Sequence, residues 1–222
     1  MKKVHILAIA AMILSVNVFA QEGFDGLYGG MSLGYTDAKD HGKEIEYVGP
    51  STWGQKNEPD GASISLNLGF NKVFENSVLV GIDGSLEKNF ATDKVYQDEY
   101  GNIDTCCTVK SKLKESIYFG GKFGKIFQSN TLIYISAGKA LKHIKRDFDD
   151  SSVPEQHSDN VWKNGWYYGA GIEKYISNNI SVLFDYKRVD LGERNYYGIS
   201  NWGIEKHDYR ENNFKIGVNY YF

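Results

Sequence analysis

Hydrophobic and polar residues alternate with a period of two along most of this chain. The clearest stretch is 62–70, where Ala, Ile, Leu, Leu and Phe occupy one face and Ser, Ser, Asn and Gly the other. Only an extended strand sorts neighbouring residues onto opposite faces in this way. The same pattern predicts eight strands, at about 27–35, 62–70, 77–88, 110–123, 131–142, 165–174, 180–189 and 212–222.

The segments between these strands differ in length in a regular manner. Long connections at 37–61, 89–109, 143–164 and 190–211 alternate with short ones at 71–76, 124–130 and 175–179. An even number of strands with long loops at one end and tight turns at the other is typical of outer-membrane barrels. The predicted fold class is therefore all-β, an eight-stranded antiparallel up-and-down transmembrane β-barrel.

The two faces of the predicted strands differ in bulk. One face is large and aromatic, whereas the other is rich in glycine with serine, asparagine and charged residues. The interior of an eight-stranded barrel has little room for large side chains, so the bulky face is expected to point outward to lipid. We therefore expect Ile64, Leu66 and Phe184 to face the bilayer, and Asp185 and Lys122 to lie inside.

The beginning of the chain has the layout of a bacterial secretory signal. Lys2 and Lys3 precede an apolar run at 6–14, and Ala20 ends the segment before polar residues. This predicts a signal peptide at 1–20 and an outer-membrane β-barrel domain at 21–222. The formal net charge of the whole chain is -3, which provides no cationic footprint for nucleic acid.

Charged residues on the glycine-rich face are expected to pair inside the barrel, because an unpaired buried charge costs several kcal/mol. Folding the sequence about the middle of 190–211 places Asp185 opposite Lys215, within expected ion-pair distance. Glu87, Lys112 and Lys114 also fall on the inward face of the predicted strands. The predicted lumen ion pairs involve Asp83, Lys122, Glu173, Asp185, Lys187 and Lys215.

Two further features interrupt the pattern. Apolar residues at inward positions near the short turns predict a layer that seals the periplasmic mouth; they are Tyr28, Leu79, Leu132 and Leu183. Glu115 and Lys139 interrupt the outer face. Folding about residue 127 sets them opposite one another near the extracellular interface, where charge costs little, so we expect a cross-strand ion pair.

The candidate chemistry is sparse. Cys106 and Cys107 are the two cysteines, and their export to an oxidising compartment makes a vicinal disulfide a candidate. A redox-sensitive loop tip, cross-links between molecules and two thiols without a role all remain open. The run His157, Ser158 and Asp159 suggests a triad, but adjacent loop residues rarely aim at one point, so a solvated loop is favoured. No catalytic residue, metal site or cofactor is predicted.

The last strand has period two and reaches the final residue, Phe222. Together with a signal peptide, this is the pattern that the outer-membrane insertion machinery reads. The predicted insertion signal consists of Phe214, Ile216, Val218, Tyr220 and Phe222.

Four motifs carry a family resemblance: GLYGG at 26–30, GWYYGAGIE at 165–173, FDYKRVDLG at 184–192 and GVNYYF at 217–222. They resemble the small outer-membrane β-barrel proteins of proteobacteria, the Omp25/Omp31-like and opacity-porin group related to the OmpA barrel. The resemblance covers essentially the whole mature chain. It implies an eight-stranded barrel with structural, surface-antigen or adhesive roles, and it supplies no catalytic residues.

We therefore expect a non-enzymatic protein of the bacterial cell outer membrane. Its partners would be outer-membrane lipid and lipopolysaccharide, the insertion machinery, and host or surface ligands bound through the loops. Two alternatives remain open. A small-solute porin would conduct, whereas a lipid A-modifying enzyme would need His, a nucleophile and a carboxylate to converge.

Overall fold

The computed structural model describes residues 23–46, 53–99, 102–127, 130–151, 156–197 and 204–222. This part of the chain is all-β, and no helix in it is long and apolar enough to cross a membrane. Its ten strands are β1 (Gly26–Glu46), β2 (Trp53–Asn57), β3 (Asp60–Val73), β4 (Val78–Asn89), β5 (Thr92–Glu99), β6 (Asn102–Phe127), β7 (Thr131–Asp150), β8 (Gln156–Ser177), β9 (Ile180–Tyr197) and β10 (Ile204–Tyr221).

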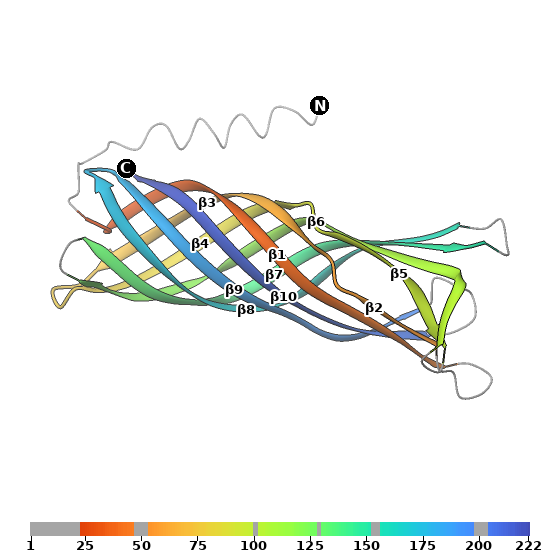
Figure 1. Cartoon of the computed structure of the whole chain (residues 1–222). Coiled ribbons are helices and arrows are strands. Elements are labelled where there is room, and N and C mark those ends of the chain that lie inside the picture. The colour runs from red at the N-terminus through yellow and green to blue at the C-terminus, as the bar shows by residue number, and fades with distance from the viewer. Residues whose placement is uncertain (1–22, 47–52, 100–101, 128–129, 152–155, 198–203) are drawn as a thin grey trace, which may run out of the picture.

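The strands form one closed, antiparallel barrel that is long and strongly tilted (Figure 1). The turns β3–β4, β6–β7 and β8–β9 gather at one end, the turn end, where β1 begins and β10 finishes. The opposite end, the loop end, carries β2, β5 and the far halves of the long strands. Strand β1 closes the barrel by pairing with β10 on one side and with β3 on the other.

The predicted count of eight strands needs correction, because the described residues form ten. Two-residue breaks interrupt the strands at two places toward the loop end. Glu58 and Pro59 separate β2 from β3, and Phe90 and Ala91 separate β4 from β5. Proline lacks the backbone N–H that a ladder requires, which accounts for the first break. Beyond the breaks, β2 and β5 pair with each other and fill the space between β1 and β6.

Most of the predicted long loops are also strand. Strand β6 has 26 residues and β8 has 22, so the segments at 89–109 and 143–164 mainly continue the barrel wall. The hydrophobic pattern predicts only the part of each strand that faces lipid. Further out the outward face carries polar side chains, so the lipid-facing period-two signal disappears although the ladder continues. The predicted signal segment 1–20 lies outside the described residues.

The predicted orientation of the two faces is confirmed. Ile64, Leu66 and Phe184 are 45%, 58% and 50% exposed on the outside, whereas Asp185 and Lys122 are buried. The exposed apolar residues form a broad band around the turn-end half of the barrel. On β1, for example, the band ends at Tyr35, and the next outward residue is Asp37.

A β-bulge in β6 reverses part of the predicted pattern. Leu113 pairs with Ile144 and Ser116 with Lys142, so Lys114 and Glu115 together oppose one residue of β7. An extra residue shifts the alternation by one. Leu113, expected outside, is therefore buried in the interior, and Lys112 and Lys114, expected inside, lie on the outer face.

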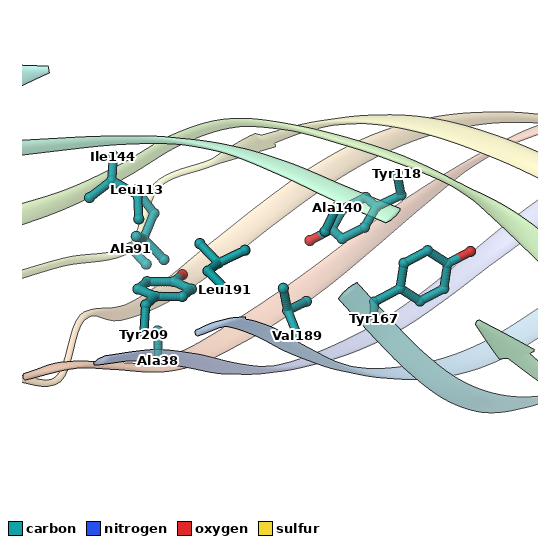
Figure 2. Close-up of a cluster of buried hydrophobic side chains, with 10 residues drawn as sticks. All are labelled: Ala38, Ala91, Leu113, Tyr118, Ala140, Ile144, Tyr167, Val189, Leu191 and Tyr209. Atoms are coloured by element: carbon teal, nitrogen blue, oxygen red, sulfur yellow. The ribbon is translucent and has the colours of Figure 1, made fainter. Parts of the chain in front are cut away.

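Two apolar clusters fill the barrel at different heights. The turn-end apolar layer contains Phe24, Tyr28, Leu79, Leu132, Tyr134 and Tyr221. The loop-side apolar cluster, shown in Figure 2, contains Ala38, Ala91, Leu113, Tyr118, Ala140, Ile144, Tyr167, Val189, Leu191 and Tyr209. Its side chains point from several strands into the barrel interior. Glycines make room for these rings: a Cβ on Gly69 would lie 2.4 Å from the Tyr28 hydroxyl oxygen.

Candidate functional site

The barrel interior holds most of the buried charge, and its centre is a four-residue ion network. We call Glu87, Lys142, Glu211 and Lys215 the central charge network. The Lys215 ammonium lies 2.6 Å from the Glu87 carboxylate, and Lys142 Nζ donates to Glu211 Oε1 at 2.5 Å. Lys142 also lies 3.8 Å from Glu87, so it joins the two pairs. All four side chains are almost completely buried.

Neutral donors complete this network. The Tyr209 hydroxyl donates to Glu211 at 2.5 Å, and Asn213 Nδ2 donates to Glu87 at 3.0 Å. The Tyr118 hydroxyl lies between the two carboxylates, at 3.3 Å from Glu87 and 3.4 Å from Glu211. Buried carboxylates with this many donors are compensated for the loss of hydration. The network therefore crosses the barrel as a bonded plug.

A small cavity lies between this network and the turn-end apolar layer. Its volume is about 40 Å³, and its walls include Asp83, Lys122, Asp185, Lys187 and Lys215. Within the described residues, Asp83 Oδ1 and the hydroxyls of two wall serines have no hydrogen-bond partner; these are Ser85 and Ser136. A cavity needs roughly 10–15 Å³ to hold one water molecule, so this one suits a few waters and no larger solute.

All six residues of the predicted lumen pairs lie in the interior, and two ion pairs join members of the set, Lys122 with Glu173 and Lys187 with Asp185. Asp185 and Lys215 are cross-strand neighbours, as the predicted register requires. Their predicted direct ion pair is nevertheless wrong. Lys215 turns to Glu87 on β4, and Asp185 lies 3.6 Å from Lys187 on its own strand. The interior is narrow enough that a lysine reaches a carboxylate across it as readily as one beside it.

The turn-end apolar layer surrounds a single buried carboxylate, Glu173. It accepts hydrogen bonds from Ser181 at 2.5 Å, Asn219 at 2.8 Å and the Tyr221 hydroxyl at 2.9 Å. Lys122 lies 3.9 Å away. Of the four residues predicted for this layer, Tyr28, Leu79 and Leu132 belong to it, and Leu183 lines the adjoining cavity.

Beyond the loop-side apolar cluster lies a second buried ion group, the outer arginine cluster of Asp40, Ser111, Arg146, Asp159 and His207. Arg146 binds both oxygens of Asp40, through Nε at 2.7 Å and Nη2 at 2.6 Å. Ser111 donates to the same carboxylate at 3.1 Å, and His207 Nδ1 lies 3.4 Å from it. Arg146 also reaches Asp159 at 3.8 Å.

Asp40 lies above the apolar band, and its environment fixes its charge. Burial opposes ionisation, but the neighbouring arginine and hydrogen bonds from His207 and Arg146 outweigh it, so the pKa of Asp40 is well below its usual range. Ser111 contacts Asp40 and not His207. A nucleophile would have to contact the histidine, so the group is arranged as a structural cluster.

On the outer surface, the bulge in β6 assembles a cluster at the upper edge of the apolar band. We call Lys88, Lys114, Glu115, His143 and Asn160 the bulge cluster. Glu115 accepts from Lys88 at 2.5 Å and lies 2.7 Å from His143 Nδ1. Asn160 Oδ1 lies 2.7 Å from His143 Nε2 and accepts from Lys114 at 3.5 Å.

The predicted ion pair between Glu115 and Lys139 is therefore wrong. The β6–β7 turn is centred two residues later than residue 127, since Phe127 pairs with Thr131, and Lys139 consequently pairs with Phe119. Its ammonium lies 3.4 Å from the centre of the Trp166 ring, a cation–π contact.

Two of the remaining candidate residues, Ser158 and Asp159, have separate partners. Ser158 donates to Asp147, whereas Asp159 faces Arg146 on the other side of β8. The side chain of His157 lies outside the described residues. Cys106 and Cys107 are joined in a vicinal disulfide near the far end of β6. Among the described residues, no group of three His, Cys, Asp or Glu side chains is placed to hold a metal ion.

Sequence reasoning missed the central and outer ion groups in part because they fall in predicted loops. Asp40, Arg146, His207 and Glu211 all lie in segments read as loop. A usable signal existed: Lys142, Ile144 and Arg146 continue the inward alternation of the preceding strand.

Comparison with known proteins agrees with this architecture. Residues 6–222 match the model of the outer membrane protein beta-barrel domain family. The 31 kDa outer-membrane immunogenic protein of Brucella melitensis is 25% identical over 256 residues, covering 100% of both chains. Among solved structures, OprG of Pseudomonas aeruginosa is similar in fold, with 13% identity, a TM-score of 0.54 and coverage of 90% of this chain and 97% of that one.

The outer membrane protease OmpT of Escherichia coli is likewise similar in fold, with 9% identity and a TM-score of 0.56, covering 91% of this chain and 98% of that one. At these identities the structures show the fold alone. The family match spans nearly the whole chain and coincides with a closed barrel whose apolar side chains face outward. The protein belongs to the outer-membrane β-barrel family and resides in the bacterial outer membrane.

Proposed function

We propose that this protein is a closed, non-enzymatic surface barrel, which anchors in the outer membrane and presents the far ends of its strands to ligands outside the cell. The observation that carries this proposal is the filled interior. The cavity of about 40 Å³ lies between the turn-end apolar layer and the central charge network, and a further apolar cluster and the outer arginine cluster lie beyond.

We propose that the part within the membrane is an eight-stranded up-and-down barrel, and that β2 and β5 lie outside the lipid. The pairings support this, because β1 contacts β3 directly over the height of the apolar band. The proposal also includes a cleaved signal peptide at 1–20. The alternating outward residues Phe214, Ile216, Val218 and Tyr220, with Phe222, are proposed as the signal for assembly into the membrane.

The role at the cell surface is supported by the length of the strands beyond the lipid. Above Tyr35 the outward residues of β1 are Asp37, Lys39, His41 and Lys43, which suit water and not acyl chains. Host factors or other surface ligands would meet this region first. The name of the Brucella relative, an immunogenic protein, is consistent with exposure at a cell surface.

Planar lipid bilayers test the proposal directly. The refolded mature chain should insert without producing conductance steps, because the apolar clusters and ion networks of the described residues fill the interior at several heights. Bilayers that receive the same detergent without protein give the baseline. Reproducible steps from the wild-type protein would favour the porin alternative and refute the closed barrel.

A second measurement addresses the enzymatic alternative. Lipid A is extracted from cells with and without the protein and analysed by mass spectrometry. Unchanged acylation and phosphorylation are expected, since Ser158 and Asp159 have separate partners. A mass change that depends on the protein would overturn the non-enzymatic assignment.

A further inference from the structure

The outer surface of the barrel carries an uneven charge at the upper edge of the apolar band. On β4, β6 and β7, the outward cations are Lys88, Lys112, Lys114, Lys139, His143 and Lys145, against the carboxylates of Glu115 and Asp147. We call this set the cationic belt. Five lysines and two carboxylates leave a net charge of +3 before His143 is counted.

The bulge in β6 creates the core of this belt. By placing Lys114 and Glu115 together opposite one residue of β7, it brings Lys88 and His143 onto the Glu115 carboxylate and places Lys114 against Asn160. His143 faces Glu115 through one ring nitrogen and the Asn160 carbonyl oxygen through the other, both at 2.7 Å. The two lysines and the one carboxylate of the bulge cluster leave a net charge of +1 before His143 is counted.

Two lysines of the belt have neutral neighbours. Lys114 donates to the Asn160 side chain, and Lys139 lies over the Trp166 ring. On the opposite side of the barrel, in contrast, outward cations lie beside carboxylates: Lys39 near Glu58 at 3.7 Å, Lys206 near Glu193 at 2.5 Å and Arg210 near Asp208 at 3.3 Å. Lys114 and Lys139 therefore have positive charge available for an external anion, whereas these three cations of the opposite side are compensated.

The position of the belt identifies the anion. Lys88 lies between Leu86 and Phe90, which are each 60% exposed, and His143 stacks on Trp162 with ring centres 4.8 Å apart. Exposed tryptophans next to cations mark the boundary between acyl chains and headgroups. A ligand that suits this surface has an apolar part against the band and negative charge at its edge.

We propose that the cationic belt binds the phosphorylated headgroup of lipopolysaccharide in the outer leaflet, with Lys114 and Lys139 facing its phosphates and Phe90, Trp162 and Trp166 facing its acyl chains and sugars. The docked molecule covers one side of the barrel, formed by β6, β7 and β8 (Figure 1). This inference concerns the lipid boundary and does not rest on the proposed role of the loop end.

The test compares the full mature protein with a double variant, Lys114→Gln with Lys139→Gln, by titrating purified lipopolysaccharide into each protein in a non-ionic detergent. The matched control is Lys39→Gln with Lys206→Gln, which removes the same charge at the opposite side. Because each basic residue near an anionic headgroup contributes appreciably, the belt variant should bind about tenfold or more weakly, and the control within twofold of wild type. Folding of each variant is checked by the heat-dependent shift of its band in SDS gels.

Three further arms define the ligand. Dephosphorylated lipopolysaccharide should bind wild type as weakly as the intact molecule binds the belt variant, and inorganic phosphate at millimolar concentration should not displace the intact molecule. The double variant Lys114→Arg with Lys139→Arg keeps both charges and should retain binding. It tests the proposal even if the glutamine variant fails to fold. Equal affinities of belt variant and wild type would overturn the proposal. An equal loss in the control, or equally tight binding of phosphatidylglycerol, would do the same.

Discussion

Replacing Lys142 by methionine removes the cation that joins the two carboxylates of the central charge network. Methionine keeps most of the volume of the side chain and none of its charge. Glu87 retains Lys215 at 2.6 Å, but Glu211 keeps only the neutral donors Tyr209, Tyr118 and Asn213. Breaking a buried ion pair from one side costs about 3–5 kcal/mol, because the remaining charge is buried without compensation.

The matched control is Lys206→Met. Lys206 lies 2.5 Å from Glu193, but its side chain is 41% exposed and that of Glu193 is 59% exposed. Pairs in water contribute about 0–1 kcal/mol, so the same substitution should have little effect there. Both proteins are refolded into phospholipid vesicles, and the free energy of unfolding is measured by urea titration with tryptophan fluorescence.

A third protein completes the cycle. Lys142→Met combined with Glu211→Gln removes both charges, and most of the stability lost in the single variant should return. The reasoning would be refuted if Lys142→Met cost less than about 1 kcal/mol, as an exposed pair does, or if the double variant were no more stable than the single one. Either result would mean that water reaches the network and screens it.

Three other outcomes follow from the structure. A Cβ on Gly138 would lie 2.2 Å from the Phe119 carbonyl oxygen, so Gly138→Ala should lower stability by about 1–3 kcal/mol in the same urea titration, and an unchanged midpoint would contradict the packing. The pKa of Asp40 is lowered, so the stabilisation that its charge provides is complete above the usual carboxyl pKa of about 4 and is lost as pH falls through the lowered value. Pepsin cleavage of the loop end should therefore accelerate only in strong acid. The Asp40→Asn variant should not show this pH dependence. Reducing the Cys106–Cys107 bond should shift the unfolding free energy by less than about 0.5 kcal/mol, because a bridge between neighbours closes almost no chain, and a larger shift would assign it a structural role.

The part of the fold that could be predicted from sequence is the part that lipid constrains. Inside the apolar band, each strand must present bulky apolar residues outward and small or polar ones inward, so Leu66 and Asp185 could be assigned to a face without any structure. Outside the band, water permits polar side chains on both faces. The continuation of β6 and β7 past the lipid consequently leaves little hydrophobic signal on the outer face, and sequence alone predicts loops there.

The interior contacts depend on two features with no local signature. The bulge at Lys114 and Glu115 reverses the alternation in β6, yet nothing in the residue types there marks an insertion. The strand register also does not determine which buried charges pair with each other. Lys215 stands beside Asp185 in the sheet but reaches Glu87 across the barrel, since a long side chain in a narrow interior samples several strands.

The continuous ladder of β6 has a consequence for how the surface of this protein can vary. Its 26 residues, at about 3.3 Å each and tilted by about 45°, rise roughly 60 Å, well over twice the apolar height of about 25 Å that such barrels span. The loop-end part of β6 is thus held well beyond the lipid by its ladders to β5 and β7. Because the outer arginine cluster lies beyond the loop-side apolar cluster, substitutions in the residues past it leave the packed interior and the lipid-facing wall untouched.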